Sequence, residues 1–140
     1  MRITPSLLAT VHLLCTLVTL GCVFLSGNRA PVYNVVDAPL DSPGSLEQVG
    51  EQIRLAARFQ NWEVEEFRPN VLLATKRYST HAATASISYD EDSFSIELRG
   101  SDHLKEGDGR IHKLYNQWVH SLEAAILGEV RAGERPAGVD

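Results

Sequence analysis

The chain has 140 residues, with 13 basic and 18 acidic side chains and a formal net charge of −5. This length is enough for one folded domain after a leader is removed. Because no cluster of lysines or arginines offsets the negative charge, we expect no nucleic-acid partner. The sequence contains no internal repeat and no low-complexity tract.

An apolar run extends from Leu7 to Leu25 and contains both cysteines of the chain, Cys15 and Cys22. Arg2 precedes this run and a polar stretch with several prolines follows it, which is the order of a secretory leader. We therefore expect the chain to be exported and to function outside the cytoplasm. Because no cysteine follows Cys22, the exported domain must be held together by its hydrophobic core and not by disulfides.

Three fates of the apolar run remain open. In the first, residues 1–21 are a signal peptide cut before Cys22, which is then acylated. In the second, residues 7–25 stay uncut as a membrane anchor, since about 19 helical residues span roughly 28 Å. The third is ordinary secretion, for which small residues are scarce after the run. Thr19-Leu20-Gly21-Cys22 resembles a bacterial lipobox with threonine in place of the usual leucine, so we favour the lipid anchor.

The remaining chain is predicted to have three parts. Residues 22–44 contain three prolines and are predicted to be a tether with one short extended piece at 32–36. Residues 45–128 are predicted to form the folded domain. Residues 129–140 are predicted to be a flexible tail.

A capping box at Ser45-Leu46-Glu47-Gln48 predicts the start of a first helix. Apolar residues then recur at helical spacing as far as Ala57, and the helix is predicted to end near Gln60. Phe59 and Trp62 are predicted to pack over the sheet that follows.

Alternating apolar and polar residues predict extended segments next, at 62–67, 71–78, 83–89 and 93–99. This one-sided pattern suits an antiparallel sheet with one covered face. The other face is predicted to be flat, polar and exposed, so that a partner can bind to it. A partner strand can also add to an uncovered edge of the sheet. The polar residues expected on it are Thr84, Ser86, Ser88, Ser93, Ser95 and Glu97.

A polar loop at 100–109 leads to a last helix, predicted from Arg110 to about Leu127 with Gly128 as its C-terminal stop. The order helix, three or four antiparallel strands, helix predicts a two-layer α+β fold with both helices on one sheet face.

The segment from Trp62 to Ile126 resembles a family of small, largely uncharacterised proteobacterial envelope lipoproteins. The resemblance rests on Ile111-His112, on Tyr115-Asn116-Gln117-Trp118-Val119, and on Phe94-Ser95-Ile96 after an acidic loop. It implies the α+β fold and a location in the cell envelope. We expect the membrane-anchored domain to face the periplasm. The resemblance implies no established reaction.

Histidines and a nearby carboxylate give the strongest candidate for a binding site. His103, Asp108 and His112 have the side chains that zinc or copper prefers, and Asn116 lies one helical turn beyond His112. In the predicted helix, His112, Asn116 and His120 share a face. The alternative is that His112 orders the loop and His120 is solvated. Because no HExxH or CxxC pattern occurs, we expect neither a metal nor another cofactor.

Nothing in the sequence predicts catalytic residues. The serines are spaced as strand residues and not as a strand-turn-helix elbow, and the acidic clusters 63–66 and 90–92 lack the glycine pattern of a calcium loop. We therefore expect a non-enzymatic, membrane-tethered envelope lipoprotein that acts as a structural or interaction module. Its partners would be the membrane, through Cys22 or an uncut anchor, and another envelope protein. The alternative is a small-ligand or metal-binding periplasmic module that uses the loop 100–112.

Overall fold

The computed structural model describes residues 27–41 and 43–133, with side chains described as far as Gly128. The predicted signal peptide at 1–21, the alternative anchor at 7–25 and the lipidation of Cys22 lie outside the described residues. Within them, no helix combines the length and the apolar character that crossing a bilayer requires.

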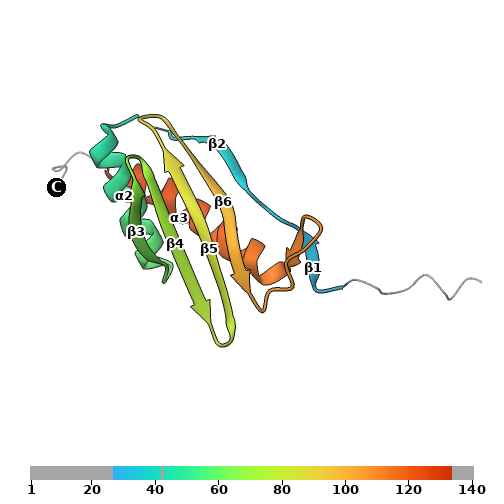
Figure 1. The fold of residues 1–140 in the computed structure, drawn as a ribbon. Coiled ribbons are helices and arrows are strands. Elements are labelled where there is room, and N and C mark those ends of the chain that lie inside the picture. The colour runs from blue at the N-terminus through green and yellow to red at the C-terminus, as the bar shows by residue number, and fades with distance from the viewer. Residues whose placement is uncertain (1–26, 42, 134–140) are drawn as a thin grey trace, which may run out of the picture.

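The fold is α+β, as predicted, with two helices and two antiparallel sheets in the described residues (Figure 1). The elements in chain order are β1 (Arg29–Pro31), β2 (Val35–Pro39), α2 (Leu46–Phe59), β3 (Glu63–Arg68), β4 (Val71–Tyr78), β5 (His81–Tyr89), β6 (Ser93–Asp102), β7 (Arg110–His112) and α3 (Lys113–Gly133).

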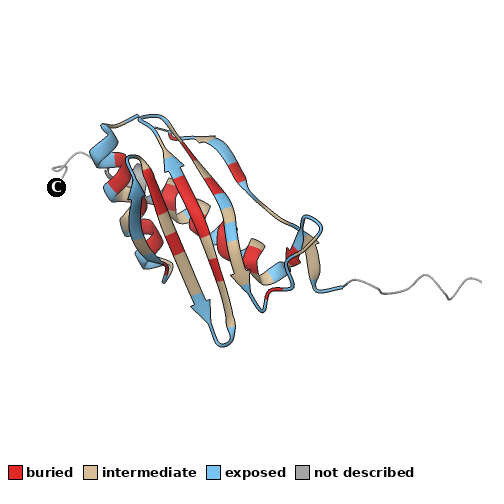
Figure 2. Cartoon of the chain, viewed as in Figure 1, coloured by how far each residue is buried: buried red, intermediate tan, exposed pale blue. Residues whose placement is uncertain are grey.

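The main sheet has five strands in the order β2-β6-β5-β4-β3, and β1 pairs with β7 in a separate sheet of two strands. Figure 1 shows both helices behind the main sheet, and no element of the described residues lies in front of it. Strand residues that alternate toward the helices, such as Leu72, Ile87 and Ile96, are buried together with Ile53 of α2 and Leu122 of α3. The resulting core lies between the sheet and the helices (Figure 2).

Helix α2 begins with the capping box that the sequence predicts. The Ser45 hydroxyl accepts a hydrogen bond from the Gln48 N–H, and the Gln48 side chain accepts one from the Ser45 N–H. Trp62 is buried as predicted, but the prediction for Phe59 is wrong, because its side chain is 78% exposed. Phe59 lies four residues after the half-exposed Leu55, on the helix face that turns away from the core.

The predicted tether is too long. β2 pairs with β6 in the main sheet, β1 pairs with β7, and Val35 and Leu40 are buried. Residues 29–40 therefore belong to the folded domain. The extended piece predicted at 32–36 overlaps β2, but the sequence did not indicate its pairing, because both pairing partners lie more than 50 residues further along the chain.

The predicted boundaries of the last helix are also wrong. Residues 110–112 form β7, because β1 gives them a backbone partner, and α3 starts only at Lys113. The loop before β7 is shorter than predicted because β6 continues to Asp102. The helix passes Gly128 and continues to Gly133, so the predicted tail is helical over its first residues. An isolated glycine costs a helix only about 1 kcal/mol and does not by itself end it.

Candidate functional site

Three of the four predicted binding residues lie near the turn after β6. His103 and Asp108 are exposed and have positive φ angles of 56° and 52°. His112 is half-buried, and its Nδ1 accepts a hydrogen bond from the Leu114 N–H at 3.2 Å. Its ring centroid lies 5.8 Å from that of His81. The His112 side chain thus caps the start of α3.

The fourth predicted residue, Asn116, holds the chain between β1 and β2. Its Oδ1 accepts a hydrogen bond from the Tyr33 N–H at 3.0 Å, and its Nδ2 donates one to the Pro31 carbonyl at 2.8 Å. The Tyr33 ring stacks on His120 with centroids 3.9 Å apart, and its hydroxyl donates to Glu123 at 2.9 Å. The hydrogen bond to this carboxylate, helped by burial, raises the pKa of Tyr33.

The predicted binding residues do not form one site. His112 precedes α3, so it does not share a helix face with Asn116 and His120 as predicted. Among residues 27–41 and 43–133, no three histidine, cysteine, aspartate or glutamate side chains come together in a group that could hold a metal ion. The loop of His103 and Asp108 thus offers separate, solvated side chains.

Lys76, which no pattern in the sequence marks as a site residue, lies on the helix side of the sheet. The Lys76 Nζ donates to the Gln60 carbonyl at 2.7 Å, and it lies 5.9 Å and 5.8 Å from the ring centroids of Trp62 and Trp118. The two rings meet edge to face at 6.5 Å. Burial disfavours the charged amine and lowers the pKa of Lys76. A lysine within a predicted strand does not show from the sequence alone that its amine lies beside two tryptophan rings.

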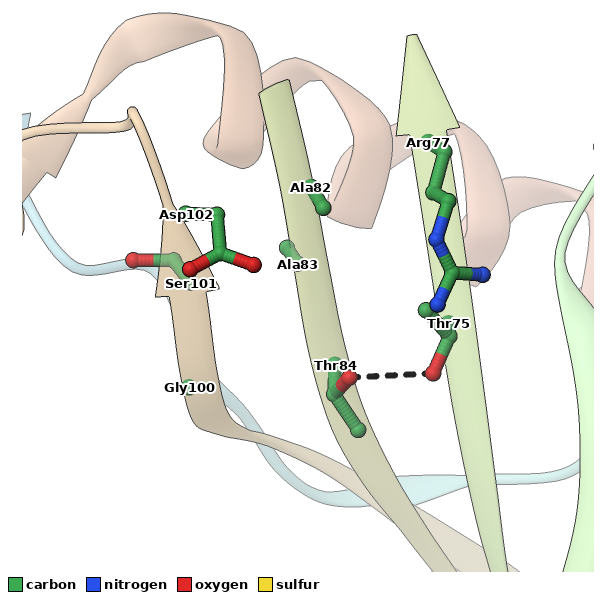
Figure 3. Close-up of a pocket in the computed structure, with 8 residues that line it drawn as sticks. All are labelled: Thr75, Arg77, Ala82, Ala83, Thr84, Gly100, Ser101 and Asp102. Atoms are coloured by element: carbon green, nitrogen blue, oxygen red, sulfur yellow. Dashed lines mark hydrogen bonds between the residues drawn. The ribbon is translucent and has the colours of Figure 1, made fainter. Parts of the chain in front are cut away.

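The sheet face opposite the helices carries the most distinctive surface feature. We call the sheet face opposite the helices the open face. At one end of it, a shallow hollow of about 260 Å³ lies over β4, β5 and β6 (Figure 3). The residues that line the hollow are Thr75, Arg77, Ala82, Ala83, Thr84, Gly100, Ser101 and Asp102.

Strand pairing explains why the surface is hollow here. One row across β4, β5 and β6 contains Thr75, Thr84 and Gly100, and the two threonine hydroxyls are 2.9 Å apart. The next row contains Arg77, Ala82 and Asp102. The small residues Ala82 and Gly100 leave the floor low. Paired residues of neighbouring strands point to the same face, so these side chains gather on one surface. The sequence alone does not show this, because it does not give the register of the strands.

The hollow has opposite charges on its two sides. Figure 3 shows Asp102 leaning from β6 toward β5, while the Arg77 side chain runs along β4 toward Thr75. Arg77 also pairs with Glu63 of β3 at 2.9 Å, and both side chains are mostly exposed. The surface therefore offers a cation, a carboxylate and hydroxyl groups, without an enclosed pocket for a small molecule.

One residue of the predicted exposed face is covered. Ser86 is only 4% exposed, because the Arg99 side chain lies over it and its Nε donates to the serine hydroxyl at 2.9 Å. A register shift between β5 and β6 places Arg99 there. The burial of Ser86 and the cation that donates to its hydroxyl oxygen make this serine unsuitable as a nucleophile.

No known protein family, no curated protein and no solved structure matches this chain. The resemblance of the segment from Trp62 to Ile126 to proteobacterial envelope lipoproteins stays a prediction.

Proposed function

We propose that the chain is a non-enzymatic envelope lipoprotein, acylated on Cys22 and facing the periplasm, whose open face binds another envelope protein. The observation that carries this proposal is the combination of an exposed, polar sheet face with helices that cover only the other side. Each strand of a one-sided sheet exposes every second side chain, so the open face offers a broad surface for weak contacts.

The start of the domain supports a tethered mechanism. Strand β1 begins at Arg29, and the chain from Cys22 to this residue can span at most about 25 Å when fully extended. A lipid on Cys22 would therefore keep the domain close to the membrane surface. Such a short connection raises the local concentration of partners on the same membrane and makes a weak binding surface sufficient.

The alternative function, a small-ligand or metal-binding periplasmic module, has less support. Its binding residues would be His103, Asp108, His112 and Asn116. The last two are engaged in holding the backbone, and the first two are exposed turn residues. Zinc-dependent stabilisation of the full chain that is lost in His112→Ala would favour this module over the proposed one.

Two measurements test the anchor. Intact-mass analysis of the protein extracted from membranes should give a chain that begins at Cys22 and carries acyl groups. The variant Cys22→Ala should lose labelling by a fatty-acid probe and accumulate as an uncut precursor. An unlabelled wild-type chain of full length would replace the lipid anchor with the uncut anchor at 7–25.

A separate measurement tests the open face. A photo-crosslinking amino acid placed at Thr84, in the middle of the hollow, should give a discrete cross-linked product in intact cell envelopes. The same amino acid at Arg58, an exposed position on α2, is the matched control and should give none. Equal products from both positions, or none from either, would contradict binding through the open face.

A further inference from the structure

The hollow on the open face has a symmetric arrangement of charges. Arg77 on β4, Ala82 on β5 and Asp102 on β6 are register partners in one row. Neighbouring strands lie about 4.8 Å apart, so the cation and the carboxylate start at equal distances on either side of Ala82. A surface with opposite charges at equal distances from a small central residue is complementary to itself.

From this arrangement we propose that the partner of the open face is a second copy of this chain, in a dimer in which Arg77 of each copy pairs with Asp102 of the other. The inference rests on the proposed function only in using the same face. A two-fold axis that runs along β5 places β4 of one copy over β6 of the other. Because the contact is the same from both sides, the assembly is closed and stops at two copies.

The row of Thr75, Thr84 and Gly100 fits the same axis. The rotation places Thr75 of one copy over Gly100 of the other, so a branched side chain faces a position that has none. A Cβ added at Gly100 would have no heavy atom within 4 Å, which shows that the space above it is open. Ala82 and Thr84 lie near the axis and are small enough to let two sheets pack closely, in the aligned manner of stacked sheets.

The orientation of the axis agrees with two chains in one membrane. A rotation about an axis along the strands keeps the strand direction, so both copies have β1 at the same end. Strand β1 lies beside the loop after β6 (Figure 1), and the Lys113 N–H donates to the Asn28 carbonyl there at 2.8 Å. Both N-terminal segments would therefore leave toward the same surface. An axis across the strands would send them in opposite directions.

The contact is small and its affinity should be modest. In the next row, beyond Thr75 and Thr84, Leu73 of one copy lies over Glu97 of the other. An apolar side chain and a carboxylate are not complementary, so the fit comes only from the row of Arg77 and the row of Thr75. Arg77 must also share its guanidinium with Glu63, but this ion pair is exposed and contributes little to stability, so it does not prevent a new contact. Attachment to one membrane supplies the local concentration that such a contact needs.

Charge exchange tests the dimer directly. The full chain is measured in density-matched detergent by sedimentation equilibrium. Each of the variants Arg77→Asp and Asp102→Arg places like charges opposite each other in its own dimer, and should weaken self-association by about tenfold or more. A one-to-one mixture of the two variants should associate nearly as well as the wild type, because both contacts then join opposite charges again. Arg58→Asp on α2 is the matched control and should associate like the wild type.

Three results would overturn the inference. They are a wild-type chain that stays monomeric at all concentrations, single variants that associate like the wild type, and single variants that are weakened but not rescued by mixing. Unfolding in urea checks that the variants are folded. If the chain is monomeric while the probe at Thr84 still cross-links to a different envelope protein, the dimer is wrong and the proposed function stands. If the probe gives no product either, both are wrong.

Discussion

Asn116 fixes the path of the chain at Tyr33, because its side-chain amide pairs with the backbone on both sides of Val32. The Oδ1 accepts from the Tyr33 N–H and the Nδ2 donates to the Pro31 carbonyl. This amide therefore fastens the N-terminal segment to α3 at the point where β1 ends and before β2 begins.

We expect Asn116→Ala to lower the free energy of unfolding by about 2 to 3 kcal/mol, since it removes two hydrogen bonds and leaves backbone groups without partners. Asn116→Asp keeps the acceptor for Tyr33 and loses the donor for Pro31, so its loss should be smaller. Urea unfolding followed by tryptophan fluorescence measures both. The matched control is Gln117→Ala at the next, exposed position, which should change stability by no more than about 0.5 kcal/mol. A loss for Asn116→Ala equal to that of the control would contradict the fastening role.

Local patterns in the sequence were enough to predict the capping box at Ser45, the strand Val71–Tyr78 and the burial of Trp62. These features depend on neighbours within a few residues. β1 and β7 were not predicted as strands, and the extended piece predicted at 32–36 overlaps β2 only at its first two residues, because each of these strands exists through pairing with a distant segment. The hollow was missed for the same reason, since Arg77 and Asp102 become neighbours only through the registers of two strand pairs.

The predicted binding residues show a second limit of sequence reasoning. Asn116 was predicted as a ligand-binding residue because it was expected to share a helix face with His112 and His120. Its contacts instead stabilise the backbone of the N-terminal segment. A polar side chain on a helix can bind a ligand or hold a strand end, and only the position of the distant segment distinguishes these roles.

Two helical glycines should respond in opposite ways to alanine. A Cβ added at Gly50 in α2 would lie 2.5 Å from the Tyr89 hydroxyl oxygen and 2.9 Å from its Cζ, whereas one added at Gly128 in α3 would meet nothing within 4 Å. We expect Gly50→Ala to destabilise the fold by about 1 to 2 kcal/mol through overpacking. Gly128→Ala should instead stabilise it by about 0.5 to 1 kcal/mol, because alanine restricts the unfolded chain and favours the helix.

Thermal and urea unfolding of both glycine variants check this prediction. A Tyr89→Leu background identifies the cause, since Gly50→Ala should be nearly neutral or stabilising once the ring is gone. If Gly50→Ala remains as destabilising in that background, the close approach of α2 to Tyr89 is not the reason.

Trp118 should be among the costliest side chains to remove. It is 8% exposed, meets Trp62 edge to face, and lies beside the Lys76 amine. We expect Trp118→Ala to lower the free energy of unfolding by about 3 to 5 kcal/mol, as for other large core aromatics. Phe59→Ala is the contrasting variant, because this ring is mostly exposed and its loss should cost less than about 1 kcal/mol. A near-neutral Trp118→Ala would mean that this ring serves a binding surface and not the core.

Lys76 makes the stability of the domain depend on pH in an unusual direction. Burial lowers its pKa in the folded state below the ordinary value of 10.5. Folding is therefore less favourable for the charged amine than for the neutral amine. Between the folded pKa and 10.5 the unfolded chain binds more protons, so stability rises with pH in that window. The two tryptophan rings act in the opposite sense, because they favour the charged amine.

Comparison with Lys76→Met separates these effects, since methionine has a similar apolar stem and does not titrate. We expect the stability of the wild type relative to Lys76→Met to be constant near neutral pH and to increase as the pH approaches 10.5. Urea unfolding of both proteins from pH 7 upward gives this difference, in which the titration of all other groups cancels. A difference that decreases toward alkaline pH would show that the contacts with Trp62 and Trp118 outweigh the loss of solvation, and that the pKa of Lys76 is raised.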